Sequence, residues 1–227
     1  MKLISIIEWR KLKAIEQSHA LLDLLVPDLL DPLEEAAMAR QANERQSAKD
    51  RWQNNGIQEL LPTRFPLRQQ SILWVSGDSG NQDPWVTGFS VDVFETLRTE
   101  EHVVASIFGH TGTDESPQAA DFQKILLARI IESAPNLSID CPELLSLRRF
   151  RRPLTPKKVW DIIDSLLLHL KSLFLVLGRI DAFEADGDGL AMIDLVQELL
   201  ALAEKHGPKI KILITAEQPL LRRFEQD

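Results

Sequence analysis

A glycine-containing segment follows an apolar run at the position where a phosphate-binding loop is expected. Residues 72–76 predict a strand and residues 85–97 predict an amphipathic helix. Strand, glycine loop and helix form the context of the phosphate-binding pattern G-x-x-x-x-G-K-[ST]. Gly77 matches its first glycine, and Gly80 matches an additional glycine common in such loops. The candidate cofactor-binding segment consists of Gly77, Asp78, Ser79, Gly80, Asn81, Gln82 and Asp83, followed by Pro84.

At the positions that bind phosphate and Mg²⁺ in the phosphate-binding pattern, this segment has residues that differ from the pattern. Gln82 stands at the second glycine, Asp83 at the lysine and Pro84 at the hydroxyl residue. In a working loop the lysine reaches the β- and γ-phosphates, and the hydroxyl holds Mg²⁺. At about 4 Å and an effective dielectric constant of about 20, one charge pair is worth roughly 4 kcal/mol. A carboxylate at the lysine position therefore predicts repulsion of a nucleotide phosphate.

Asp83 and Pro84 also have a structural interpretation. Aspartate is a good N-cap, and proline suits the first position of a helix. The N-terminus of a helix normally attracts phosphate through its unpaired N–H groups. A built-in carboxylate would occupy that role, so a plugged site is the favoured interpretation. Nucleotide binding in another pose is the alternative.

The elements that would position this segment alternate between apolar runs and helical patterns. Runs such as residues 173–177 are continuously apolar, which is typical of strands buried on both faces of a parallel sheet. The alternation predicts an α/β fold with a three-layer parallel sheet. The expected strands are 72–76, 103–108, 173–177 and 210–215, and the expected helices are 84–98, 119–133, 156–170 and 190–205.

The first 55 residues predict a helical segment ahead of an α/β domain at 56–227. One helix is expected over residues 3–25 and a second over 32–54, where an Asn-Asn-Gly sequence follows as a stop signal. A helical hairpin packed on the main domain is the favoured interpretation. The alternative is an arm that binds a partner.

Five stretches in sequence order carry a resemblance to a known family. They are Gly56–Leu61, Ile72–Gly77, Val104–Phe108, Leu173–Asp181 and Ile212–Thr215. Over about residues 50–220 the chain resembles the fungal STAND family of P-loop ATPases, the NACHT-type domain of NOD-like receptors. The resemblance implies a P-loop NTPase fold, whose nucleotide state typically switches such proteins between closed and oligomeric forms.

The chain departs from this family at three predicted strand ends. The second family motif, Asp-Gly-Leu-Asp-Glu, corresponds here to residues 178–182. The resemblance places Gly178 where an aspartate supports Mg²⁺, and Ala182 where an acid activates water, so that only Asp181 remains. Glu217 stands where the family has an arginine that senses the γ-phosphate. Phosphoryl transfer depends on positioning and charge neutralisation, so these losses predict a chain that does not hydrolyse nucleotides.

Charge, hydropathy and cysteine content exclude several classes of protein. The formal net charge of −8 argues against a general nucleic-acid binder. No run approaches the ~18 apolar residues of a membrane span, and charges follow the apolar start too soon for a secretory signal. The single cysteine, Cys141, excludes an internal disulfide and fits a reducing compartment. We therefore expect a cytoplasmic (intracellular) protein that binds neither membrane nor nucleic acid.

Two charged clusters and the histidines carry weaker signals. The acidic residues Asp181, Glu184, Asp186 and Asp188 partly match a calcium loop, but the bidentate glutamate position holds Leu195. A solvated acidic loop is the favoured interpretation. The five histidines lack metal spacing, so no metal site is expected. The basic cluster, favoured as a solvated connector over a binding patch, is Arg148, Arg149, Arg151, Arg152, Lys157 and Lys158.

These observations predict a non-catalytic, pseudo-NTPase scaffold or protein-interaction module, without a cofactor. Its expected partner is another protein or a second copy of itself. The alternative is a nucleotide switch or NTPase that binds ATP or ADP through non-standard ligands. In that alternative Arg179, which follows the predicted strand 173–177, is the nearest cation to replace the missing lysine.

Overall fold

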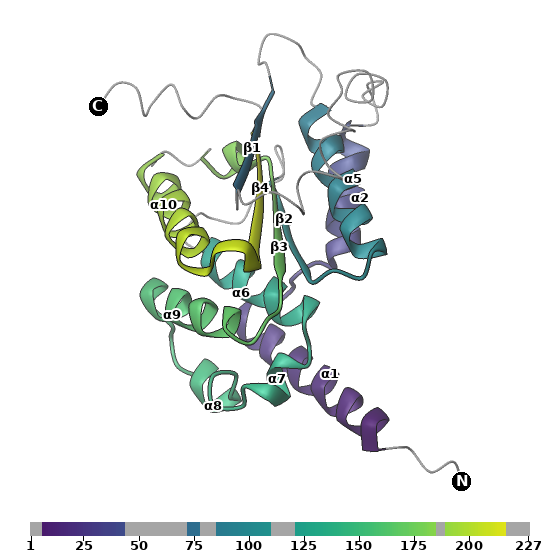
Figure 1. Cartoon of the computed structure of the whole chain (residues 1–227), viewed down its shortest axis with the longest axis vertical. Coiled ribbons are helices and arrows are strands. Elements are labelled where there is room, and N and C mark those ends of the chain that lie inside the picture. The colour runs from purple at the N-terminus through teal and green to yellow at the C-terminus, as the bar shows by residue number, and fades with distance from the viewer. Residues whose placement is uncertain (1–5, 44–71, 78–84, 110–120, 185–188, 217–227) are drawn as a thin grey trace.

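A four-stranded, fully parallel sheet forms the centre of the molecule (Figure 1). The structure, a computed structural model, describes residues 6–43, 72–77, 85–109, 121–184 and 189–216. The strands are β1 (Ile72–Ser76), β2 (Val104–Phe108), β3 (Leu173–Gly178) and β4 (Ile210–Ala216), in the order β1-β4-β3-β2. All residues of β2, β3 and β4 are buried, as the continuous apolar runs predicted. The α/β class and the parallel sheet are therefore confirmed.

Helices cover both faces of this sheet. On one face α2 (Pro32–Asn43) and α5 (Trp85–Thr99) pack against side chains such as Phe174 and Leu213. The opposite face is covered by α1 (Ile6–Leu25), α6 (Phe122–Ser133), α9 (Pro156–Leu167) and α10 (Gly189–His206). Short helices complete the described chain: α7 (Leu137–Asp140), α8 (Leu147–Phe150), η3 (Ile180–Glu184) and η4 (Gly207–Lys209).

The strand order explains why the helices divide between the faces. From β1 the chain crosses to the far edge at β2 through α5, and then returns through β3 to β4. Crossovers between parallel strands are right-handed, so a reversal of direction moves the connecting helix to the other face. The helices α6, α9 and α10 accordingly lie opposite α5.

The two N-terminal helices both pack on the α/β body, as the favoured interpretation expected, but they do not form a hairpin. Leu21 and Leu25 of α1 join the core on the α6 side, whereas Ala36 and Ala39 of α2 join the core on the α5 side. The chain therefore passes around the edge of the sheet at β2. The proposed boundary at residue 55 lies outside the described residues, as does the expected extension of the second helix to residue 54.

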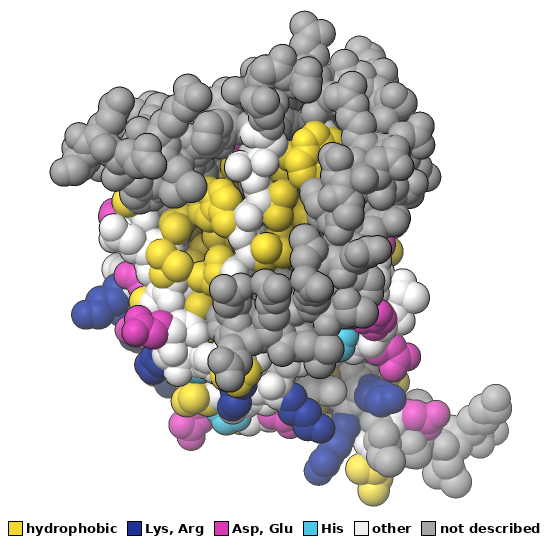
Figure 2. Space-filling model, turned by 45° about the horizontal axis from the view of Figure 1, so that its top comes forward, with side chains coloured by type: hydrophobic (Ala, Val, Ile, Leu, Met, Phe, Trp, Pro, Cys, Tyr) yellow, Lys and Arg dark blue, Asp and Glu magenta, His cyan; other side chains and the backbone are white. Residues whose placement is uncertain are grey.

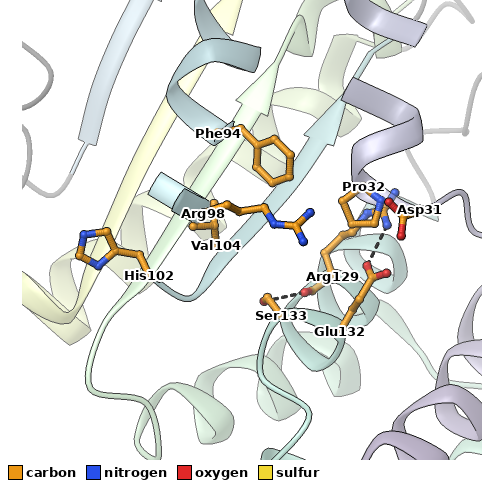
Figure 3. A pocket seen from close by; sticks show the side chains of 9 residues that line it. All are labelled: Asp31, Pro32, Phe94, Arg98, His102, Val104, Arg129, Glu132 and Ser133. Carbon is orange, nitrogen blue, oxygen red and sulfur yellow. Dashed lines mark hydrogen bonds and ion pairs between the residues drawn. The ribbon is translucent and has the colours of Figure 1, made fainter. Parts of the chain in front are cut away.

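A buried ion pair between Glu35 and Arg129 holds the N-terminal segment, which wraps around the sheet, against the edge strand β2. Glu35 Oε1 accepts the backbone N–H of Phe108 at 2.9 Å, and its Oε2 accepts a hydrogen bond from Arg129 of α6. Arg129, whose side chain is 2% exposed, also donates to the carbonyl of Leu30 at 2.7 Å and to Glu132 at 2.9 Å (Figure 3). Burial raises the pKa of Glu35, opposed by the Arg129 charge and the Phe108 N–H. We call this pair the Glu35–Arg129 clamp; it joins α2, β2 and α6.

Candidate functional site at the carboxyl edge of the sheet

The carboxyl ends of the four strands meet at one edge, where open α/β sheets bind their ligands. The connection after β1 crosses one face and the connection after β3 crosses the other, with β4 between them. The backbone N–H of Gly77 donates to Ala216 O at 2.8 Å, and the N–H of Arg179 donates to Thr215 Oγ1 at 3.1 Å. The segments that follow β1 and β3, which carry two of the three predicted motifs, are therefore hydrogen-bonded to β4.

Gly77 is the only residue of the candidate phosphate loop within the described part of the chain. Its hydrogen bond to β4 places the start of the segment beside Ala216. Residues 78–83 lie outside the described residues, and so does Glu217 after β4. The replacements at the lysine position and at the sensor arginine therefore stay sequence predictions.

Gly178 is enclosed at the position that the resemblance gives to a Mg²⁺-supporting aspartate. A Cβ added there would lie 2.9 Å from Ser90 Oγ and 3.0 Å from Phe108 Cε1, and would clash with Phe108 Cδ1. Both neighbours are buried, and the Phe108 ring packs edge-on against Phe94 at a centroid distance of 5.8 Å. An aspartate side chain has no room in this packing.

Arg179 and Asp181 form an ion pair within the turn that follows β3. Arg179 Nη2 lies 3.4 Å from Asp181 Oδ2, and both side chains are largely buried. Arg179 has a φ of 54°, in the left-handed region that costs a non-glycine residue roughly 1–2 kcal/mol. The structure brings together the two residues that the sequence singled out here, and the carboxylate offsets the charge of the candidate substitute cation.

The position that the resemblance gives to the water-activating acid holds an alanine. Ala182, at the place of the water-activating acid, is buried and donates its N–H to Arg179 O at 3.0 Å. Within the described ranges, no group of three or more His, Cys, Asp or Glu residues could hold a metal ion. Asp186 and Asp188 of the acidic cluster lie outside those ranges.

The described surface at this edge is dominated by uncharged side chains. Figure 2 brings the top of the first view forward, and the described atoms near its centre are hydrophobic or uncharged. The Lys, Arg, Asp and Glu side chains described in that view lie mainly around its lower part. Phosphate sites concentrate cations or N–H donors. The visible described part of this edge shows no cationic cluster of that kind.

A pocket at the other end of β2 is lined by charged side chains that have partners of their own. It has a volume of about 290 Å³ and is lined by residues that include Arg98, His102 and Glu132 (Figure 3). Glu132 accepts from Arg129, Arg98 lies over the Phe94 ring at 5.6 Å, and His102 lies 3.3 Å from a Glu100 oxygen. We interpret this pocket as a packing gap between α2, α5 and α6.

Sequence reasoning missed the residues that fill or frame this edge, namely Ser90, Phe108, Glu35 and Arg129. One signal was available, because Arg129 interrupts the otherwise apolar run of α6 and such a residue needs a buried partner. Nothing local identifies Glu35 as that partner. The packing of Phe108 on Gly178 has no signature in either strand.

Comparisons of this chain with protein-family models, with curated proteins and with solved structures found no match. Among the described helices, none combines the length and the apolar character needed to cross a membrane.

Proposed function

We propose that this chain is a non-catalytic P-loop NTPase-like domain of STAND/NACHT type that acts as a scaffold or protein-interaction module. The observation that carries the proposal is the enclosure of Gly178 by Phe108 and Ser90. A site that has only lost an acid would keep a space for Mg²⁺, whereas here protein atoms occupy the space that the acid would need. The Arg179–Asp181 pair supports the same conclusion, because it offsets the charge of a nearby cation.

The order and direction of the strands are compatible with this proposal. The loop-like segment follows β1, the second motif follows β3, and β4 lies between them in a fully parallel sheet. The ligand crevice of an open α/β sheet lies at such a point. The proposed scaffold keeps the sheet and closes the crevice with its own side chains.

The test is calorimetric titration with ATP and ADP, with and without Mg²⁺, up to millimolar concentration. We expect no heat of binding and no rise in melting temperature. A ligand at 100 times its Kd would stabilise the fold by about 2.7 kcal/mol, so binding would be visible in the melt. The proposal also expects Asp83→Lys to leave ATP turnover undetectable, because restoring the lysine does not open the position at Gly178.

The alternative is an ATP- or ADP-binding switch with non-standard ligands. The hydrogen bond from the Arg179 N–H to Thr215 Oγ1 favours this alternative, because the bond holds a cationic residue at the carboxyl edge of the sheet. Saturable nucleotide binding that Arg179→Ala abolishes would support this alternative and overturn the scaffold proposal. Binding that survives this substitution would overturn the scaffold proposal and exclude Arg179 as the phosphate ligand.

A further inference from the structure

The first two turns of α1, residues 6–13, project from the body as an exposed tip (Figure 1). Ile6, Trp9 and Leu12 are 77%, 54% and 56% exposed. The buried positions of α1 begin at Ala14 and continue towards Leu25, on the opposite side of the helix from Trp9. The apolar side of the tip therefore faces away from its own molecule.

The tip is also basic. Arg10, Lys11 and Lys13 stand against a single carboxylate, Glu8. The Nζ of Lys13 lies 5.6 Å from the centre of the Trp9 ring, so a cation accompanies the largest apolar side chain. Such a helix end fits a groove with an apolar floor and an acidic rim.

A groove with this character lies between α9 and α10. Its volume is about 800 Å³, and its floor includes the buried side chains of Trp160 and Leu195. The exposed acids Asp161, Asp194 and Glu198 line it, against one lysine, Lys157. The tip carries an excess of two positive charges and the groove lining an excess of two negative charges.

We propose that the α1 tip of one copy docks into the α9–α10 groove of a second copy. In Figure 1 the α1 tip lies at the lower right, whereas α9 and α10, whose residues line the groove, lie at the left, so the tip cannot reach the groove of its own chain. The contact joins two different surfaces and is head-to-tail, which generates rings or open filaments. The inference rests on the proposed function, because it names a second copy as the partner of the scaffold.

Sedimentation velocity and light scattering over a concentration series, up to near-millimolar protein, measure this association. We expect the average mass to rise with concentration and the association to weaken at high salt, which screens exposed charges. Trp9→Ala should lower the association constant by about tenfold or more, as for a central aromatic anchor. Leu24→Ala, at a residue 41% exposed on the same helix, is the matched control and should change nothing.

Charge reversal identifies the two surfaces. The tip variant Lys11→Glu/Lys13→Glu and the groove variant Asp194→Lys/Glu198→Lys should each be monomeric. An equimolar mixture of the two variants should associate again, because each reversed surface then meets its complement. Glu204→Lys, on α10 but outside the groove lining, is the control and should associate like the unmodified chain. Unchanged melting curves show that the variants are folded.

A chain that stays monomeric throughout the series overturns the proposal. Self-association that both reversals leave intact overturns it too, as does a mixture that stays monomeric. Binding of the tip to anionic vesicles without self-association would instead assign the tip to a lipid surface. Nucleotide titration of the same samples separates the two proposals, since nucleotide binding overturns the scaffold function and leaves the docking result standing.

Discussion

Gly178 is a point at which β2, β3 and α5 make a close core contact. The absence of a Cβ lets the Phe108 ring and the Ser90 hydroxyl meet the backbone of β3. Phe108 in turn packs on Phe94 of α5, so the contact links β2, β3 and α5. Placing a carboxylate at this position would need a repacked core as well as a new residue.

We predict that Gly178→Ala destabilises the fold by about 1–3 kcal/mol, the usual cost of overpacking a core. The added Cβ would clash with Phe108 Cδ1 and approach Ser90 Oγ at 2.9 Å. Urea unfolding followed by circular dichroism gives the change in free energy of unfolding. The double variant Gly178→Ala/Phe108→Leu should lose less than the sum of the single variants, because the smaller side chain relieves the clash.

Gly88→Ala is the matched control for this prediction. Gly88 lies inside α5, and a Cβ added there meets nothing within 4 Å. Alanine in a helix interior is favoured over glycine by roughly 0.5–1 kcal/mol, so this variant should be more stable. A destabilised Gly88→Ala, or a neutral Gly178→Ala, would contradict this account of the packing.

Among the contacts between helices and strands, the Glu35–Arg129 clamp determines how the N-terminal helices pack on the sheet. Glu35 accepts the outward N–H of Phe108 at the edge of the sheet, and Arg129 holds the same carboxylate from the other face. Exposed strand edges invite pairing with other chains. The clamp occupies a donor of the β2 edge and orients α2 against α5.

Removing one partner of the clamp should be costly. Glu35→Ala leaves the buried Arg129 charge without its main partner, and breaking such a pair typically costs about 3–5 kcal/mol. Arg40→Ala is the control, because Arg40 pairs with Asp92 and Glu95 near the surface, where such pairs are worth about 0–1 kcal/mol. Thermal melts of both variants check the prediction. Equal losses would show that burial does not set the strength of the clamp.

A second connection joins the C-terminal ends of α9 and α10. Asp164 accepts a hydrogen bond from Lys205 at 2.7 Å, and its other oxygen lies 2.8 Å from His206 Nε2. Burial opposes the ionisation of Asp164, but the hydrogen bonds and charges of Lys205 and His206 outweigh it and lower its pKa. The connection lies about one helical turn beyond Asp161 and Ala201, which line the groove between the two helices.

The lowered pKa of Asp164 predicts the pH dependence of its contribution. Since the folded pKa lies below the unfolded value, the contribution is present above the unfolded value of 3.8 and is lost as pH falls through the folded pKa. Asp164→Asn should therefore cost about 1 kcal/mol at neutral pH and progressively less below pH 3.8. Urea unfolding at a series of pH values measures this, and a pH-independent loss would refute it.

In the molecule as a whole, the features that could be predicted from the sequence are the strands and helices that depend on local residue patterns. The four expected strands correspond to β1–β4, and the three that are fully buried, β2, β3 and β4, have the near-continuous apolar runs that such strands need. Pro156, at the first turn of α9, marks a helix start at the predicted residue. The interval from residue 134 to 155, which lies between the expected helices 119–133 and 156–170, contains the short helices α7 and α8.

Contacts between distant residues were not predictable. Glu35 and Arg129 are 94 residues apart, and neither flanking sequence specifies the other. The candidate site was only partly predictable for the same reason. Arg179 and Asp181 lie close in sequence and could be named as candidates from it, whereas the enclosure of Gly178 depends on residues from β2 and α5.

The wrap of α1 and α2 predicts that the α/β body does not fold well without them. A chain that starts at residue 44 would expose the surfaces of α6 and α5 that Leu21 and Ala36 now cover. We expect this fragment to bind a hydrophobic dye and to lose cooperative unfolding, whereas the full chain unfolds in one transition. Dye fluorescence and denaturant curves test this. A fragment with a sharp, unchanged transition would show that 1–43 is an accessory segment.

The same wrap has a consequence for how the protein is made. Helices α1 and α2 leave the ribosome before β2 and α6, the elements on which they pack. At synthesis rates of about 5–20 residues per second, the 94 residues that separate Glu35 from Arg129 represent about 5–20 s of waiting. Throughout that interval the apolar side of α1 lacks its partner α6, whereas α2 can pack on α5 once Thr99 has been made. Each nascent chain therefore offers a binding site for chaperones before its sheet exists.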